Sequence, residues 1–210
     1  KVKRIDFKGG EPMLAKAHTD FLEYLIKQNR TDIHLFYTTN GTVRNPNIIK
    51  MLDKFDRVSI SFSIEGTGEL YKYIRGGKYN LEDFGKSVKA YSELSNAEIM
   101  YNVTVQNYNV LNLHKLYDYL VQLSEPYDNV SSKQCFTTIC NNPYYLSPTN
   151  IPDVVRDQVV KNLEGNLEFE KLCQSLLKRE FNPEHWEVFV KYTRQLDQMR
   201  NENFLNLEPA

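Results

Sequence analysis

Apolar and polar residues alternate along much of the first part of the chain in the period-two pattern of β-strands. The clearest case is the segment in which Val58, Ile60, Phe62 and Ile64 alternate with three serines. Similar patterns, bounded by glycine, asparagine or charged residues, recur on both sides of it. They predict strands at Val2–Phe7, Ile33–Thr38, Val58–Ile64, Ile99–Val105 and, in a more polar segment, from about Lys133 to Ile139.

Between these strands, apolar residues recur every three or four positions, which is the period of an amphipathic helix. Asn45-Pro46 has the residue types of a helix N-cap and first helical position, and Asn80 with Asp83 resembles a cap with its partner three residues on. A glycine-containing loop is expected between the strand that ends at Ile64 and the cap at Asn80. Helices are predicted for about 15–28, after Asn45, after Asn80, around Leu113–Leu120, and at Ile151–Leu163, Leu167–Lys178 and Pro183–Met199.

Alternating strands and helices predict an α/β fold with a parallel sheet and right-handed crossovers. Both a partial (β/α) barrel and an open doubly wound sheet fit the pattern. In either one, ligands bind at the carboxyl ends of the strands. Beyond Pro143 the pattern becomes purely helical, and we therefore expect a helical extension over residues 146–210 after an α/β part over residues 1–145.

Composition narrows the class of protein. The 210 residues carry 26 Lys and Arg against 27 Asp and Glu, which gives no electrostatic reason to expect general nucleic-acid binding. No apolar run approaches the roughly 18–20 residues of a membrane helix, and the chain opens on a predicted strand without a signal peptide. Three cysteines, Cys135, Cys140 and Cys173, form no disulfide framework, so a reducing cytoplasm is expected. Cys173 has the helical spacing of a packed residue.

The end of the first predicted strand reads Gly9-Gly10-Glu11-Pro12. The glycines permit positive φ angles or close backbone approach, and the Glu11 carboxylate can accept hydrogen bonds from an ammonium group. The alternative is a tight turn into a helix, where a carboxylate near the helix start is favoured by the helix dipole. The second strand end, Thr38-Thr39-Asn40-Gly41, has the residues of a simple turn.

Three further strand-end or loop features carry polar groups. Ser59, Ser61 and Ser63 share one side of the third strand, either as a solvent-facing side or as polar groups that need partners inside a barrel. Arg75 is expected in the loop that follows, where it is either a surface residue or a partner for a carboxylate ligand. Asn102 offers a donor and an acceptor that suit ribose or carboxylate binding, or is a sheet-edge asparagine.

Together, these motifs resemble those of the radical S-adenosylmethionine (SAM) enzymes. The resemblance implies that Gly9, Gly10, Glu11 and Pro12 form the motif whose acidic residue binds the SAM amino group. It implies further SAM-binding roles for Ser61, Arg75 and Asn102, weaker ribose roles for Ser63 and Glu65, and a place near the site for Asn40. Residues 143–147, 196–200 and 203–205 resemble relatives that carry a shortened C-terminal extension called a twitch domain.

The C-x3-C-x2-C loop of that family is missing from this sequence, and the cysteines present do not have its spacing. Because thiolates hold such clusters, we assign no metal ligand in this chain and expect an N-terminally incomplete barrel that lacks the family's first strand. In the intact protein, the resemblance implies a [4Fe–4S] cluster, a 5′-deoxyadenosyl radical and hydrogen abstraction from a peptide or small polar substrate. It also implies an electron donor such as flavodoxin or ferredoxin. The fragment alone is expected to be inactive, and no residue is assigned to the hydrogen transfer.

Two other classes of function remain open from the residues alone. The first is a non-catalytic module that uses the same barrel to bind a nucleotide or a protein. The second is an unrelated α/β hydrolase or isomerase, which ranks last because no ordered set of nucleophile, histidine and acid is visible.

Overall fold

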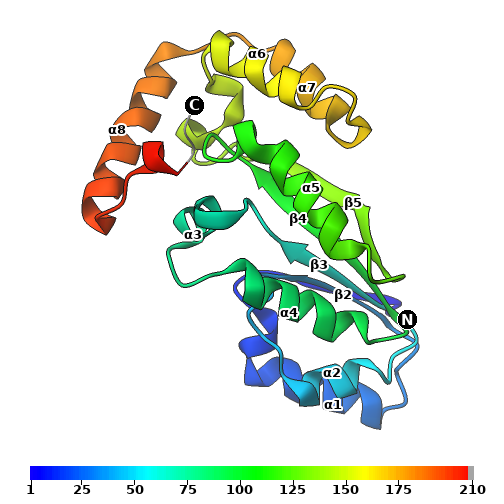
Figure 1. The fold of residues 1–210 in the computed structure, drawn as a ribbon. Helices are drawn as coiled ribbons and strands as arrows, with labels where there is room; N and C mark the ends of the chain where they lie inside the picture. The colour runs from blue at the N-terminus through cyan, green and yellow to red at the C-terminus, as the bar shows by residue number, and fades with distance from the viewer. Residues whose placement is uncertain (208–210) are drawn as a thin grey trace. The chain divides into compact units, whose positions relative to one another are not determined.

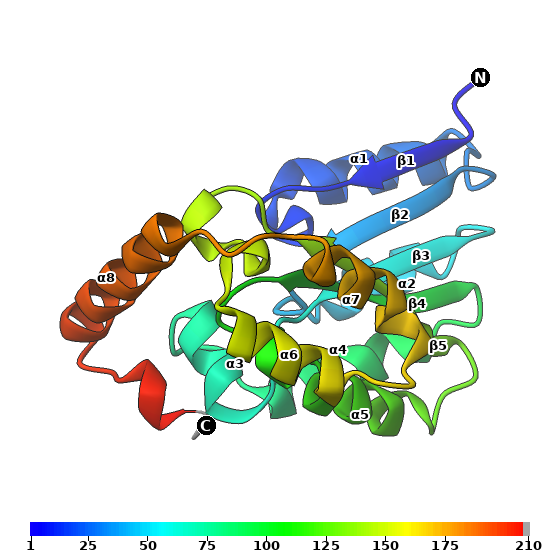
Figure 2. The ribbon, with the colours of Figure 1, turned by 90° about the horizontal axis from the view of Figure 1, so that it is seen from above.

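The computed structural model describes residues 1–207, and within them it forms a sheet of five strands in the order β1-β2-β3-β4-β5 (Figure 2). β1 pairs with β2, β2 with β3 and β3 with β4, all in parallel. The predicted α/β fold with a parallel sheet is therefore confirmed. The strands are β1 Arg4–Phe7, β2 His34–Thr39, β3 Val58–Ser63, β4 Ala97–Val105 and β5 Val130–Ile139.

Helices connect the strands and continue to the C-terminal end of the described residues. Asn45 and Asn80 cap α2 and α4 as predicted: their side-chain oxygens accept hydrogen bonds from the backbone N–H groups of Asn47 and Asp83. The helices are α1 Lys16–Lys27, α2 Pro46–Leu52, α3 Gly68–Arg75, α4 Leu81–Ser92, α5 Leu113–Ser124, α6 Asp153–Asn162, α7 Glu170–Leu177 and α8 Pro183–Arg200. Short 3₁₀ turns are η1 Pro12–Leu14, η2 Val110–Asn112, η3 Tyr144–Leu146, η4 Pro148–Asn150, η5 Leu167–Phe169 and η6 Phe204–Asn206.

Two of these helices differ from their predictions. The expected loop before Arg75 is helix α3, because Leu70, Tyr71 and Tyr73 bury one side of it. Gly76, at a φ of +86°, ends this helix, so Arg75 is its last residue rather than a loop residue. The helix predicted for 167–178 is divided into η5 and α7. Cys173 of α7 is only partly buried, whereas its helical spacing predicted a buried, packed side chain.

The chain divides into two compact units that are interleaved in the sequence. The first comprises Lys1–Ile64, Asn80–Val103 and Leu120–Phe136, and the second comprises Glu65–Tyr79, Thr104–Tyr119 and the residues from Thr137 onward. The units are described separately below. The division at residues 145 and 146, which rests on the sequence pattern, stays a prediction.

In the first unit, helices α1, α2 and α4 cover one face of strands β1 to β3 (Figure 1). Alternate apolar side chains of the strands point to these helices; the Phe62 ring, for example, lies 5.7 Å from the Phe84 ring of α4. The other face carries the serines of β3. Ser59 and Ser61 are buried, with 2% and 3% of their surface exposed, so a solvent-facing side is ruled out for them. Ser59 has a partner in the His34 ring, 2.8 Å away.

In the second unit, an aromatic core is built around Tyr73, Tyr108 and Phe189, with Trp186 and Phe204 packed against it. Helix α8 holds the end of α3 through two polar contacts to Tyr73. The Tyr73 hydroxyl donates to Asp197 at 2.9 Å, and Arg200 donates to the Tyr73 carbonyl oxygen at 2.8 Å. Burial and the hydrogen bond to Asp197 raise the pKa of Tyr73, so this hydroxyl stays a donor. None of the described helices has the length and apolarity needed to cross a membrane.

His18, on α1, gives the first unit a pH-dependent element. It is 6% exposed, its Nε2 atom lies 2.9 Å from the Tyr37 hydroxyl, and the Phe7 ring packs on its edge at 5.0 Å. Burial lowers the pKa of His18, so between the folded and unfolded pKa values the unfolded chain binds more protons. Stability from this site is therefore present above the unfolded pKa of about 6.5 and is lost as pH falls below it.

We expect the urea midpoint of the wild-type chain to fall between pH 7.5 and pH 5 more steeply than that of His18→Gln, which cannot be protonated. Urea titrations at several pH values, followed by far-UV circular dichroism, measure this. Equal pH dependence in wild type and His18→Gln would contradict the assignment.

Candidate functional site

The Gly9-Gly10-Glu11-Pro12 motif forms the connection between β1 and η1. Gly9 and Gly10 have φ angles of +81° and +47°, in the left-handed region that favours glycine. A Cβ atom added at either position would meet nothing within 4 Å. The glycines are therefore required by the backbone conformation rather than by crowding, and they leave open space beside the turn.

The Glu11 carboxylate is held by the end of the neighbouring strand. Its Oε2 atom accepts hydrogen bonds from the Thr39 hydroxyl at 2.8 Å and from the Asn40 backbone N–H at 3.0 Å. Its Oε1 atom is buried and, among the described residues, has no hydrogen-bond partner. A buried acceptor without a donor is costly, so this oxygen is suited to a donor group from a ligand, such as an ammonium.

Asn40 contributes to this arrangement through its backbone. Its side-chain oxygen accepts from the backbone N–H and the hydroxyl of Thr42, at 2.9 and 2.7 Å, and is thereby committed to the turn. Sequence reasoning missed Thr39, the residue that donates to Glu11 from its side chain. The sequence gave little indication of this role, because Thr39 lies on the helix-facing side of β2 and its neighbours have the residue types of a simple turn.

Ser61, Ser63 and Asn102 lie on one face of two adjacent strands. In the parallel register Ser63 is opposite Asn102, and Ser61 is opposite Met100. Paired residues of neighbouring strands point to the same side of a sheet, so these three polar side chains share the face opposite α1, α2 and α4. Ser61 is buried, while Ser63 and Asn102 are partly buried.

Glu65 and Arg75, in the second unit, form a buried two-pronged ion pair. Arg75 Nε lies 2.6 Å from Glu65 Oε2, and Arg75 Nη2 donates to Glu65 Oε1 at 2.8 Å. Burial raises the pKa of Glu65, and the Arg75 charge opposes that rise. The sequence-based interpretation of Arg75 as a loop residue beside a serine is therefore wrong in its local structure. Much of its donor capacity is used by Glu65.

Asn109 is a second residue that sequence reasoning missed. It is 1% exposed, and its amide nitrogen donates to the carbonyl oxygens of Glu65 and Thr104, both at 2.9 Å. Its side-chain oxygen accepts from the Gln106 backbone N–H at 2.8 Å. Asn109 thus links Glu65, which follows β3, to the end of β4, and both ends of its side-chain amide are hydrogen-bonded. The sequence did not single out Asn109, because several other asparagines lie close to it.

No metal site is built within residues 1–207: no group of three or more His, Cys, Asp or Glu side chains is placed to hold an ion. Cys135, Cys140 and Cys173 are partly buried. Burial raises the pKa of the Cys140 and Cys173 thiols, which disfavours the thiolate that a metal needs. These side chains do not fit an iron–sulfur cluster.

A comparison with models of protein families gives the same answer as the sheet and its strand-end motifs. The model of the radical SAM superfamily matches residues 1–120, more than half of the chain. The chain belongs to the radical SAM superfamily. The resemblance drawn from the strand-end motifs is confirmed, and so is the fold class of a partial radical SAM (β/α) barrel.

Solved radical SAM structures share this fold. Native anSMEcpe with bound AdoMet and Kp18Cys peptide matches with a TM-score of 0.55 and 18% identity, over 76% of this chain and 45% of that one. Native anSMEcpe with bound AdoMet and Cp18Cys peptide matches with a TM-score of 0.53 and 19% identity, over the same shares. At such identity the likeness concerns the fold alone. No curated protein sequence matches the chain at a significant level.

This radical SAM chain spans less than half the length of those solved relatives. The individual roles given to Gly9, Gly10, Glu11, Pro12 and the other strand-end residues stay predictions. Within the first unit, the structure brings Glu11 together with Asn40, and places Ser61, Ser63 and Asn102 on one face. Within the second, it brings Glu65 together with Arg75.

Proposed function

We propose that this chain is the SAM-binding core of a radical SAM enzyme and that Glu11 binds the amino group of SAM. The observation that carries the proposal is the Glu11 carboxylate, which has one oxygen held by Thr39 and Asn40 and the other buried without a partner. An ammonium group supplies the missing donor, and a charge-assisted hydrogen bond of this kind is stronger than a neutral one. Similar folds with bound AdoMet support the same class of ligand.

The polar face of the sheet supplies the other proposed contacts. Ser61, Ser63 and Asn102 offer hydroxyl and amide groups that suit the ribose and carboxylate of SAM. Arg75, on α3 of the second unit, keeps its SAM-binding role as a separate proposal, supported by N–H donors beyond the two that meet Glu65, which suit a carboxylate. A reduced [4Fe–4S] cluster, when bound, would supply the electron that cleaves SAM, and SAM would supply the deoxyadenosyl group that abstracts hydrogen. The cluster ligands are not among the described residues, and this chain's part is to bind and orient SAM.

The substrate is proposed to be a peptide or another small polar molecule. The support for a peptide is the pair of similar folds that were solved with a bound peptide. Residues 146–207, with the aromatic core around Phe189, are proposed to be the C-terminal extension of the twitch type.

Calorimetric titration of the chain with SAM tests this function. We expect Glu11→Gln, which keeps the shape and removes the charge, to weaken SAM binding about ten- to hundred-fold, the worth of a hydrogen bond to a charged group. Glu98→Gln is the matched control: this carboxylate of β4 bonds to Arg57 and Gln134, so SAM affinity should stay within about two-fold. Unaltered SAM binding by Glu11→Gln, or no binding by the wild-type chain, would sink the proposal.

A further inference from the structure

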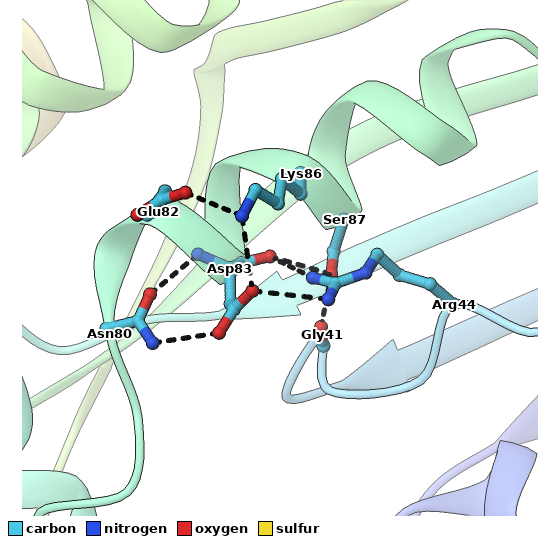
Figure 3. Close-up of polar contacts among 7 residues, drawn as sticks. All are labelled: Gly41, Arg44, Asn80, Glu82, Asp83, Lys86 and Ser87. Carbon is cyan, nitrogen blue, oxygen red and sulfur yellow. Dashed lines mark hydrogen bonds and ion pairs between the residues drawn. The ribbon is translucent and has the colours of Figure 1, made fainter.

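Helix α4 holds the loop that donates to Glu11. Ser87 of this helix is fully buried, and its hydroxyl donates to the carbonyl oxygen of Gly41, in the loop after β2 (Figure 3). Gly41 has a φ of +74°, and a Cβ atom there would lie 3.1 Å from the Phe62 ring. The loop that contains Asn40 therefore packs closely against Phe62 of β3, and the Ser87 hydroxyl ties it to α4.

A second contact of α4 with the same loop lies at the surface. Arg44 donates to the Asp83 backbone carbonyl oxygen at 2.6 Å and to its carboxylate at 3.2 Å (Figure 3). The hydrogen bond from Asn80, followed by those from Arg44, lowers the pKa of Asp83, so it is charged at neutral pH. Because the pair is exposed, it contributes little free energy. The buried Ser87 contact is the more important of the two.

One turn further along α4, the Tyr91 hydroxyl contacts both the loop after β2 and the segment that follows Glu11. Its hydroxyl lies 2.9 Å from the Val43 carbonyl oxygen and 2.9 Å from the Met13 sulfur, and it donates its one proton to either acceptor. Val43 belongs to the loop after β2, and Met13 lies two residues after Glu11. Met13 and Tyr91 are both buried. Burial and the nearby Glu11 charge raise the pKa of Tyr91, so the hydroxyl keeps its proton.

We propose that Ser87 and Tyr91 are positioning residues for SAM: they fix the Asn40 loop against the Glu11 segment, so that Glu11 presents its free oxygen to the amino group. The inference rests on the proposed function of Glu11. The reason is geometric, because the two hydrogen bonds to Glu11 Oε2 come from Thr39, the last residue of β2, and from Asn40, the first residue of the loop after it. If that loop moves, the carboxylate loses the Asn40 donor, and its oxygens are no longer held in one direction.

The test compares two ligands, SAM and the SAM analogue that lacks the α-amino group. Tyr91→Phe removes one hydroxyl and keeps the ring packed against Phe62. We expect Tyr91→Phe, and separately Ser87→Ala, to weaken SAM binding about three- to ten-fold, the worth of one hydrogen bond. Binding of the des-amino analogue should change by less than about two-fold, because it gains nothing from Glu11. Equal weakening for both ligands, or an unchanged SAM affinity, would overturn the inference.

The matched control is Tyr101→Phe, which removes the hydroxyl of another fully buried tyrosine in the same unit. That hydroxyl bonds to Ser124 at 3.0 Å. Its loss should lower the melting temperature while leaving SAM affinity within about two-fold. If Tyr91→Phe does not fold, Ser87→Ala carries the test. Glu11→Gln is the reference variant. If it weakens binding of SAM but not of the des-amino analogue, and neither Ser87→Ala nor Tyr91→Phe shows that difference, the inference fails while the proposed function stands. When Glu11→Gln has no effect, the proposed function fails as well.

Discussion

Arg75→Ala should destabilise the folded chain by about 3 kcal/mol at pH 7.5, because it leaves the Glu65 carboxylate buried and unpaired. In the wild type this carboxylate meets Arg75 at 2.6 and 2.8 Å and has little exposed surface. Urea unfolding gives the difference in free energy. The control is Arg57→Ala: its side chain is 63% exposed and its partner Glu98 is only partly buried, so the loss should stay below about 1 kcal/mol.

The pH dependence of the same variant tests the cause. Burial raises the pKa of Glu65, and removing Arg75 removes the influence that opposes the rise, so its folded-state pKa climbs further above the ordinary 4.5. The folded variant then binds more protons than the unfolded chain, and its stability falls as pH rises through that window. The deficit of Arg75→Ala should therefore shrink as pH falls from 7.5 toward 4.5. A deficit that is constant with pH would contradict a buried unpaired charge.

Phe189→Ala should cost about 3–5 kcal/mol, the usual range for a large buried aromatic side chain. Phe189 is 4% exposed, and its ring lies 5.1 Å from that of Tyr108 and 5.0 Å from that of Trp186. Trp186 is the single tryptophan of the sequence, so its fluorescence follows unfolding of the second unit directly. Met199→Ala, on the same helix but 84% exposed, should cost less than about 0.5 kcal/mol. Equal fluorescence midpoints for the two variants would contradict the core assignment.

The order of strands and helices was predictable because it depends on local patterns. The alternation in Val58–Ser63 and the caps at Asn45 and Asn80 each act within a few residues, and all three are found where expected. Helix α3 was missed because the glycines on both sides of it indicate a loop. What stabilises it is the burial of Leu70 and Tyr73 in the folded chain, and tertiary packing of this kind leaves no local signal.

The candidate site was predictable as a set of residue types but not as a set of contacts. Glu11 could be chosen because the Gly9-Gly10-Glu11-Pro12 run, in order with the other strand-end motifs, resembles the radical SAM pattern. The Thr39 donor, 28 positions away, follows from the pairing of β1 with β2, which a single sequence does not specify. For the same reason, the partnership of Arg75 with Glu65 depends on how α3 turns back, and sequence reasoning assigned Arg75 to a ligand carboxylate instead.

The position of β1 in the sheet affects how the chain behaves at high concentration. β1 stands at one end of the strand order, so the backbone groups along its outer side have no strand partner within residues 1–207. Such a side is a template for adding another extended segment, from a second copy or from an unfolded chain. The charged pair Arg4 and Asp6 on this strand discourages that addition.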